Sequence, residues 1–104
     1  MSVQLLKLTS GEEMVAEVGD EDKDHIWVKN PLRLVVMEKG AALAPFFPAA
    51  KDGGLNGKKI KMERKFVMLS LDVDSDVSNA YNSQLGSGIV VPNAQQTMKL
   101  IDPE

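Results

Sequence analysis

The chain has 104 residues, a net charge of −3 and no cysteine. This length suits one domain with one core, and the lack of cysteine excludes disulfides, thiolate nucleophiles and thiolate metal sites. The weakly acidic balance argues against a protein that coats duplex nucleic acid through global charge. No apolar run approaches the roughly 20 residues that span a bilayer. Residues 1–13 lack the basic and apolar regions of a signal peptide, so we expect a cytoplasmic protein.

The first 36 residues predict a run of three strands. Residues 3–8 alternate between two faces and end at the turn "TSGEE", where Gly11 supplies a positive φ. Residues 14–18 form a second period-2 segment. A third strand covers residues 26–36 but contains Asn30-Pro31. Because proline cannot donate to a β-ladder, we expect a bend there.

The middle of the chain is less regular. Pro45 and Pro48 flank Phe46 and Phe47, which predicts an edge strand, a bulged strand or an extended segment. A glycine-rich loop, "KDGGLNG", follows. Residues 59–62 and the segment "KFVMLSLD" then alternate again, which predicts two more strands.

The pattern changes to a helical period after residue 72. Val77, Ala80, Tyr81 and Leu85 fall on one helical stripe. Asp74, Ser75 or Asp76 can cap the start of this helix, and Gly86 or Gly88 can close it. We therefore expect one domain over residues 1–88 and a tail over residues 89–104, with a short strand and then a disordered end.

Five or six strands in meander order followed by one helix predict a mostly β fold. Local connections favour antiparallel pairing. Several strands are apolar on both faces, so a sheet this small is expected to curl into a small barrel. The bend at Asn30-Pro31 supplies curvature of the kind that such a barrel needs.

Signs of enzyme chemistry are few. His25 is the only histidine, so a site with two histidines or with histidine and cysteine cannot form. It lies beside an acidic turn and away from any nucleophile elbow, and no phosphate-binding glycine motif occurs. We expect no catalysis and no cofactor.

Residues 72–83 do not match a calcium-binding loop at the positions that determine its geometry. Asp72, Asp74 and Asp76 match the first three ligand positions, but Val77 replaces the required Gly and Ser83 the bidentate Glu. Helix capping explains these acids, and we expect no metal.

Charge is unevenly distributed. Residues 12–24 are acid-rich, and residues 58–65 are basic. Either both are solvated turns, or the basic run contacts phosphates through two lysines on one strand face and two cations at the next turn. These four residues are Lys59, Lys61, Arg64 and Lys65.

The aromatic residues also allow both a structural and a binding interpretation. Trp27 and Tyr81 could stack on bases, but core positions are the simpler interpretation. Phe46 and Phe47 are interpreted as buried or as an oligomer interface, because "ALAPFFPAA" has almost no polar face. An exposed apolar edge needs a cover, which favours a homo-oligomer.

The first half of the chain resembles a known family. "VQLLKLTSGEEMVAEV", an acidic turn and "HIWVKNPLRLVV" are similar to the first signature of the Sm-like (LSm) family: Gly11, residues 15–18, Glu21, His25 and residues 26–28. "KNPLRLVV", "LAPFFPAA" and "KFVMLSLD" resemble a divergent branch of short Sm-like proteins found in phages. The resemblance covers residues 2–72. The Arg-Gly of the family's second signature is missing, and "FVMLSLD" holds its place.

This resemblance implies a strongly bent five-stranded antiparallel, SH3-like barrel that closes into rings by strand pairing between subunits. It implies an RNA site at which Glu21 and His25 occupy the positions that contact a base, with Arg64 or Lys65 in place of the family's arginine. The location implied for a phage protein is the host cytoplasm.

The resulting hypothesis is a homo-oligomeric ring that binds single-stranded RNA. Lys59, Lys61, Arg64 and Lys65 would hold phosphates, and His25 would contact a base. The alternative is an interaction module on the same fold that binds phage or host proteins and no nucleic acid. The acid-rich residues 12–24 favour this alternative, because they would repel RNA.

Overall fold

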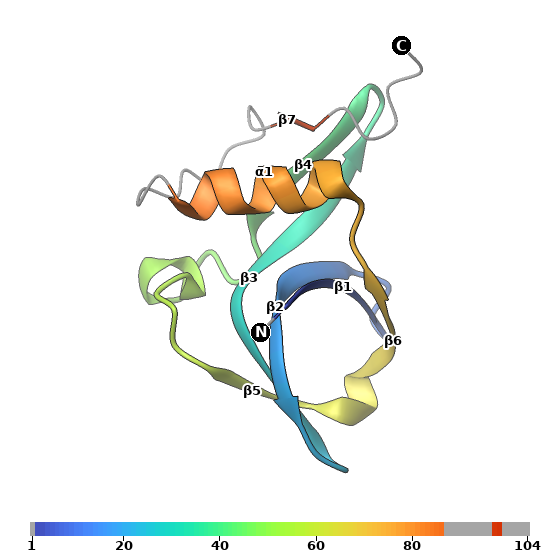
Figure 1. The fold of residues 1–104 in the computed structure, drawn as a ribbon, viewed down its shortest axis with the longest axis vertical. Coiled ribbons are helices and arrows are strands. Elements are labelled where there is room, and N and C mark those ends of the chain that lie inside the picture. Colours follow the sequence, from blue (N-terminus) through green and yellow to red (C-terminus); the bar gives the residue numbers. More distant parts are fainter. Residues whose placement is uncertain (1, 87–96, 99–104) are drawn as a thin grey trace.

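The computed structural model describes residues 2–86 and 97–98, and it is mostly β with one α-helix near the C-terminus (Figure 1). In chain order the elements are β1 Ser2–Leu8, β2 Glu13–Glu21, β3 His25–Met37, β4 Gly40–Pro45, the 3₁₀ turn η1 Lys51–Gly54, β5 Ile60–Glu63, the 3₁₀ turn η2 Arg64–Phe66, β6 Val67–Asp72, α1 Ser75–Gly86 and β7 Thr97–Met98. Among the described residues, no helix is both long and apolar enough to cross a bilayer.

The strands form one antiparallel sheet in the order β6-β1-β2-β3-β4-β7. Both β4 and β5 pair with β3, β4 along its second half and β5 along its first half. The intervening residues 46–59 leave the sheet as a loop. The predicted count of five strands is not confirmed, because β4 and β7 join the sheet as well.

The sheet curls strongly, and two of its edge strands, β5 and β6, are consecutive in the chain, joined by η2 (Figure 1). No strand pair between β5 and β6 is found in the described part of the chain. Hydrogen-bonded closure into a barrel, which the sequence predicts, is therefore not confirmed.

The predicted bend at Asn30-Pro31 is a β-bulge. Val15 of β2 lies opposite Leu32, but Glu17 lies opposite Lys29, so the single residue between them on β2 faces two residues of β3. Asn30 has a φ of +50°, a conformation that asparagine tolerates better than most residues. The extra residue reverses the side-chain alternation of β3, so its two halves send their even-numbered residues to opposite faces of the sheet.

This reversal lets one strand contribute to two apolar clusters. The cluster beneath α1 takes Leu32, and the cluster on the other face of the sheet takes Ile26 and Val28. The buried members of the first are Val15, Leu32, Ala41, Leu43, Val77 and Tyr81; those of the second are Leu6, Leu8, Met14, Ala16, Ile26 and Val28. The bend therefore has a structural purpose, because it divides β3 between the two clusters.

Helix α1 packs on the sheet through the predicted stripe. Val77 and Tyr81 are buried, and Ala80 and Leu85 pack beside them. Asp74 caps the helix, since its Oδ1 accepts a hydrogen bond of 3.0 Å from the backbone N–H of Asp76.

Two aromatic positions differ from expectation. Trp27 was expected in the core, but it is only half-buried on the outer face of the sheet. Phe66 was expected within a strand, but it lies in η2 and is 48% exposed. Tyr81, in contrast, is fully buried as predicted.

Within the tail, β7 pairs with Ala41 and Ala42 of β4. The other residues of 89–104 lie outside the described residues, so the disordered end and the domain boundary at residue 88 stay predictions.

Candidate functional site

The turn between β2 and β3 is built around Asp22. Its Oδ1 accepts hydrogen bonds from the backbone N–H groups of Asp24 (2.8 Å) and His25 (2.7 Å). These bonds lower the pKa of the Asp22 carboxyl below its usual value, and the adjacent His25 side chain lowers it further. The turn thus fixes where β3 begins and where His25 emerges.

The turn η2 is tied to this β2–β3 turn by Arg64. The Arg64 backbone N–H donates to the carbonyl of Asp24 (2.9 Å), and its Nη1 donates to Oε1 of Glu21 (2.9 Å). On the neighbouring strand pair, His25 lies opposite Glu63. Residues 21–25 and 63–65, far apart in sequence, therefore meet at one end of the sheet.

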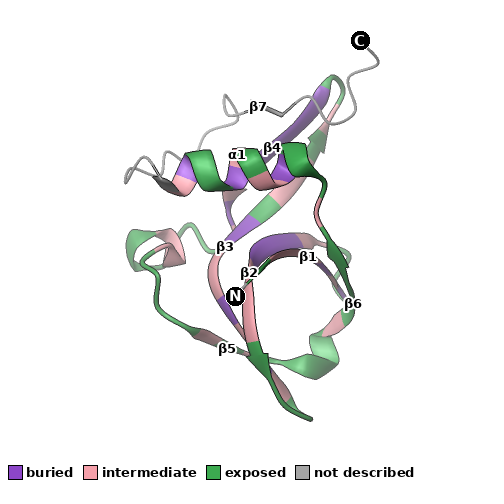
Figure 2. Ribbon diagram, viewed as in Figure 1, coloured by how far each residue is buried: buried purple, intermediate pink, exposed green. Residues whose placement is uncertain are grey.

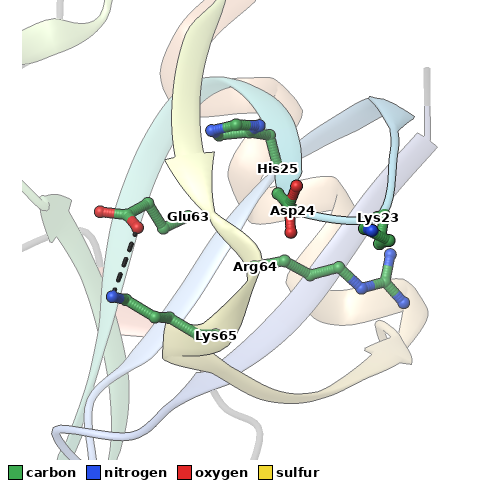
Figure 3. A pocket seen from close by; sticks show the side chains of 6 residues that line it. All are labelled: Lys23, Asp24, His25, Glu63, Arg64 and Lys65. Carbon is green, nitrogen blue, oxygen red and sulfur yellow. Dashed lines mark ion pairs between the residues drawn. The ribbon is translucent and has the colours of Figure 1, made fainter.

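An open hollow of about 620 Å³ lies between these two turns (Figure 3). Its size falls within the range of small-molecule sites. The lining residues are Lys23, Asp24, His25, Glu63, Arg64 and Lys65. We call these six residues together with Glu21 the mixed-charge cluster.

The structure places four of the six predicted RNA-contacting residues in this cluster: Glu21, His25, Arg64 and Lys65. The arginine of this set does not lie against the histidine ring. Figure 3 shows the Arg64 side chain extending toward Lys23 and not toward the His25 ring. Its guanidinium is already engaged by Glu21.

The other two predicted residues lie on or beside β5, outside the hollow. The Lys61 ammonium is 5.4 Å from the centroid of the Trp27 ring, a cation–π contact across the β3–β5 pair. Lys59 lies 4.0 Å from Asp20. The basic run therefore does not present one continuous row of free cations.

The acid-rich and basic runs face each other at this end of the sheet. Lys65 pairs with Glu63 at 3.5 Å, and the pairs of Lys59 and Arg64 with acids of β2 add to this pattern. Because these side chains are largely exposed, each pair stabilises the fold only slightly. The pairs nevertheless offset much of the positive field that a bound phosphate chain would need.

Sequence reasoning missed the acids that shape this site. Asp22 forms the turn, and Asp24 and Glu63 line the hollow. The segment "GDEDKD" does indicate a role for Asp22. Aspartate favours turns in which its carboxylate accepts hydrogen bonds from the backbone N–H groups of the residues that follow it. Nothing local in the sequence places Glu63 opposite His25.

A second surface is apolar. Strand β6 pairs with β1 on one side, and the described strands include no partner on its other side. Figure 2 shows β6 and much of η2 in the colour of exposed residues. The large exposed hydrophobic side chains here are Phe66 (48%), Met68 (63%), Leu69 (44%) and Leu71 (54%). We call β6 with Phe66 the apolar edge.

The predicted interface residues lie elsewhere. Strand β4, at the start of "ALAPFFPAA", is paired on both sides, by β3 and β7, and is largely buried. Phe46 is half-buried and packs against the second cluster, whereas Phe47 is 41% exposed at the start of the loop 46–59. Only Phe47 has the exposure that a contact with another chain needs.

Among the described residues, no group of three or more His, Asp or Glu side chains is arranged to hold a metal ion. No protein-family model matches the chain, and a search of curated proteins finds no relative.

Proposed function

We propose that the protein is an Sm-like subunit that assembles into a homo-oligomeric ring through the free edges of strands β5 and β6. The observation that carries this proposal is the apolar edge. A strand of six residues with an unpaired side and exposed Met68, Leu69 and Leu71 is a template for another strand. Its exposed apolar side chains favour burial against a protein surface.

The strand order supports the Sm-like part of the proposal. Strands β4 and β5 pair with successive halves of β3, so they act as one strand interrupted by the loop 46–59. Counted in this way, the curled sheet has five strands in the order β6-β1-β2-β3-β4/β5, with a 3₁₀ turn between the two edge strands. A small, strongly bent antiparallel sheet of five strands is what the resemblance implies.

Two of the free strand edges, those of β5 and β6, support self-association; the third, β7, has only two residues. Strand β5 pairs with β3 alone, and β6 pairs with β1 alone. A contact between β5 of one copy and β6 of the next is heterologous, and such contacts form a ring when the rotation between copies closes on itself. Each copy then covers the apolar edge of its neighbour.

Light scattering on three proteins tests this proposal. The wild type is expected to have the mass of several chains. Leu69→Lys with Leu71→Lys places charges on the apolar edge and should give the mass of one chain. Val36→Lys is the matched control, because Val36 is 62% exposed but lies on β3 away from this edge. Equal masses for the edge variant and the wild type would overturn the proposal.

Single-stranded RNA is the second candidate function, and the hollow of the mixed-charge cluster favours it. Lys23, His25 and Lys65 line this open space together, which suits contacts to a phosphate and a base. The acids in the same lining oppose it. If no nucleic acid binds, the ring is an interaction module for other proteins, as the alternative hypothesis states.

Anisotropy of labelled oligo-U and oligo-A separates these functions. Binding through several phosphates must weaken steeply as salt increases. The quadruple alanine variant of Lys59, Lys61, Arg64 and Lys65 should lose this binding, whereas Lys39→Ala, on the distant β3–β4 turn, should retain it. No binding by the wild type at low salt would remove RNA as a function.

A further inference from the structure

We infer that, where β5 of one copy meets β6 of the next in the proposed ring, Lys58 forms an ion pair with Asp72 of the neighbouring copy and so fixes the strand register. This inference rests on the proposed ring. It adds a register and a pair of residues to a contact that the free edges alone leave undefined.

The two free edges have opposite charge at opposite ends. Basic residues precede and enter β5, namely Lys58, Lys59 and Lys61. Acidic residues end and follow β6, namely Asp72, Asp74 and Asp76. One chain therefore carries both halves of a charge-complementary contact, which is what a head-to-tail assembly requires.

The direction of pairing follows from these charges. In an antiparallel pair, the start of β5 lies beside the end of the neighbour's β6, so Lys58 meets Asp72. In a parallel pair, the start of β5 would instead lie beside the start of β6, where Arg64 and Lys65 precede the strand. Like charges placed directly opposite each other on strands are destabilising, so the parallel arrangement is disfavoured.

Side-chain alternation sets the register. Ile60 and Met62 face the second apolar cluster, and Ser70 faces the same side because it lies opposite buried Leu6 of β1. Placing Ile60 beside Ser70 of the neighbour continues this inner face from one copy to the next. With this register, an extended backbone through residues 58–60 places Lys58, two residues before Ile60, beside Asp72, two residues after Ser70, on that same face.

Both side chains are available for this contact. Lys58 and Asp72 are exposed, and neither has an ion-pair partner within residues 2–86. Their neighbours have other roles: Lys59 contacts Asp20, and Asp74 caps α1. Lys61 contacts the Trp27 ring, and Asp76 lies within α1, beyond the end of β6. Lys58 and Asp72 therefore remain available at these two ends for a second copy.

A charge-swap experiment tests the pair. Lys58→Asp, Asp72→Lys and the double variant are diluted, and the midpoint of dissociation is followed by light scattering, with circular dichroism as a check on folding. We expect each single variant to raise the midpoint concentration about fivefold. The double variant restores opposite charges at every contact, whatever the ring size, and should lie within about twofold of wild type.

Lys39→Asp, on the β3–β4 turn, controls for the change in net charge and should behave as wild type. If the single variants match wild type, or if the double variant is no better than the singles, the ion pair is refuted. In that case, loss of assembly in the Leu69→Lys with Leu71→Lys protein would still support the proposed ring. A wild type that is one chain at all concentrations overturns ring and ion pair together.

Discussion

The Tyr81 hydroxyl donates a 2.8 Å hydrogen bond to the backbone carbonyl of Asn30, which joins helix α1 to the bulge of β3. The same hydroxyl lies 3.2 Å from the carbonyl of Lys29. Since the bulge divides β3 between two clusters and α1 covers one of them, this contact ties the helix to the point at which β3 changes from one cluster to the other.

Tyr81→Phe removes the hydroxyl and leaves these carbonyls without their donor. We expect a loss of about 1–3 kcal/mol in the free energy of unfolding, measured by urea denaturation. Ser83→Ala, at an exposed position on the same helix, is the control and should change stability little. A Tyr81→Phe protein as stable as wild type would show that the contact does not stabilise the bend.

Tyr81 also predicts a response to alkaline pH. Burial raises the pKa of its phenol above the usual value, and the charge of Glu17 raises it further. The folded state then keeps a proton that the unfolded state releases above about pH 10, so stability decreases as pH rises beyond that point. Urea denaturation at increasing pH should show a smaller decrease for Tyr81→Phe than for wild type; parallel curves would contradict this.

Asn30 has both a positive φ and two side-chain hydrogen bonds. Its Oδ1 accepts from the N–H of Gly57 (2.9 Å), and its Nδ2 donates to Glu17 (3.1 Å). Alanine and glycine both remove these bonds, but only alanine is strained at this φ. We expect Asn30→Ala to be less stable than Asn30→Gly by about 1 kcal/mol in thermal or urea unfolding. The reverse order would mean that backbone strain does not matter at the bulge.

Asp22 predicts a response to acid. Because its pKa is lowered in the folded state, its stabilising contribution is complete above the usual carboxyl value of 3.8 and is lost as pH falls through the lowered pKa. Asp22→Asn keeps an acceptor for the turn without the titration. The difference in unfolding free energy between wild type and this variant should be constant near about pH 6. Near about pH 3, wild type should lose stability relative to the variant. A difference independent of pH would contradict the role of the carboxylate.

Phe47 provides an independent test of the interface. Its side chain is 41% exposed at the start of the loop that leads to β5. Phe47→Asp should lower the oligomer mass while leaving the fold of a single chain largely unchanged. Val36→Asp, at a more exposed position on β3, should leave the mass unchanged. An unchanged mass for Phe47→Asp would remove this loop from the contact.

Local features of the fold were predictable from the sequence because local chemistry determines them. Gly11 adopts the positive φ expected in the first turn, and Val77 and Tyr81 form the buried stripe of α1. The bend at Asn30-Pro31 follows from proline chemistry. Its effect on side-chain alternation does not, because a bulge is defined by the pairing of β3 with β2.

The candidate site was less predictable, since it depends on contacts between distant segments. The sequence separates the acid-rich and basic runs, and only the pairing of β3 with β5 brings Glu63 beside His25 and η2 beside the β2–β3 turn. The sequence predicts an oligomer interface at Phe46 and Phe47 and gives no sign of the apolar edge on β6. Apolar alternation in "FVMLSLD" resembles that of a covered strand, so only the topology reveals that β6 has a free side.

The mass of the wild-type protein in solution, measured by light scattering over a range of concentrations, tests the central claim most directly. Assembly through β5 and β6 predicts a closed species whose mass is a fixed multiple of the 11.3 kDa chain. A mass of one chain at every concentration would contradict the account, because the apolar edge would then have no second copy to cover it.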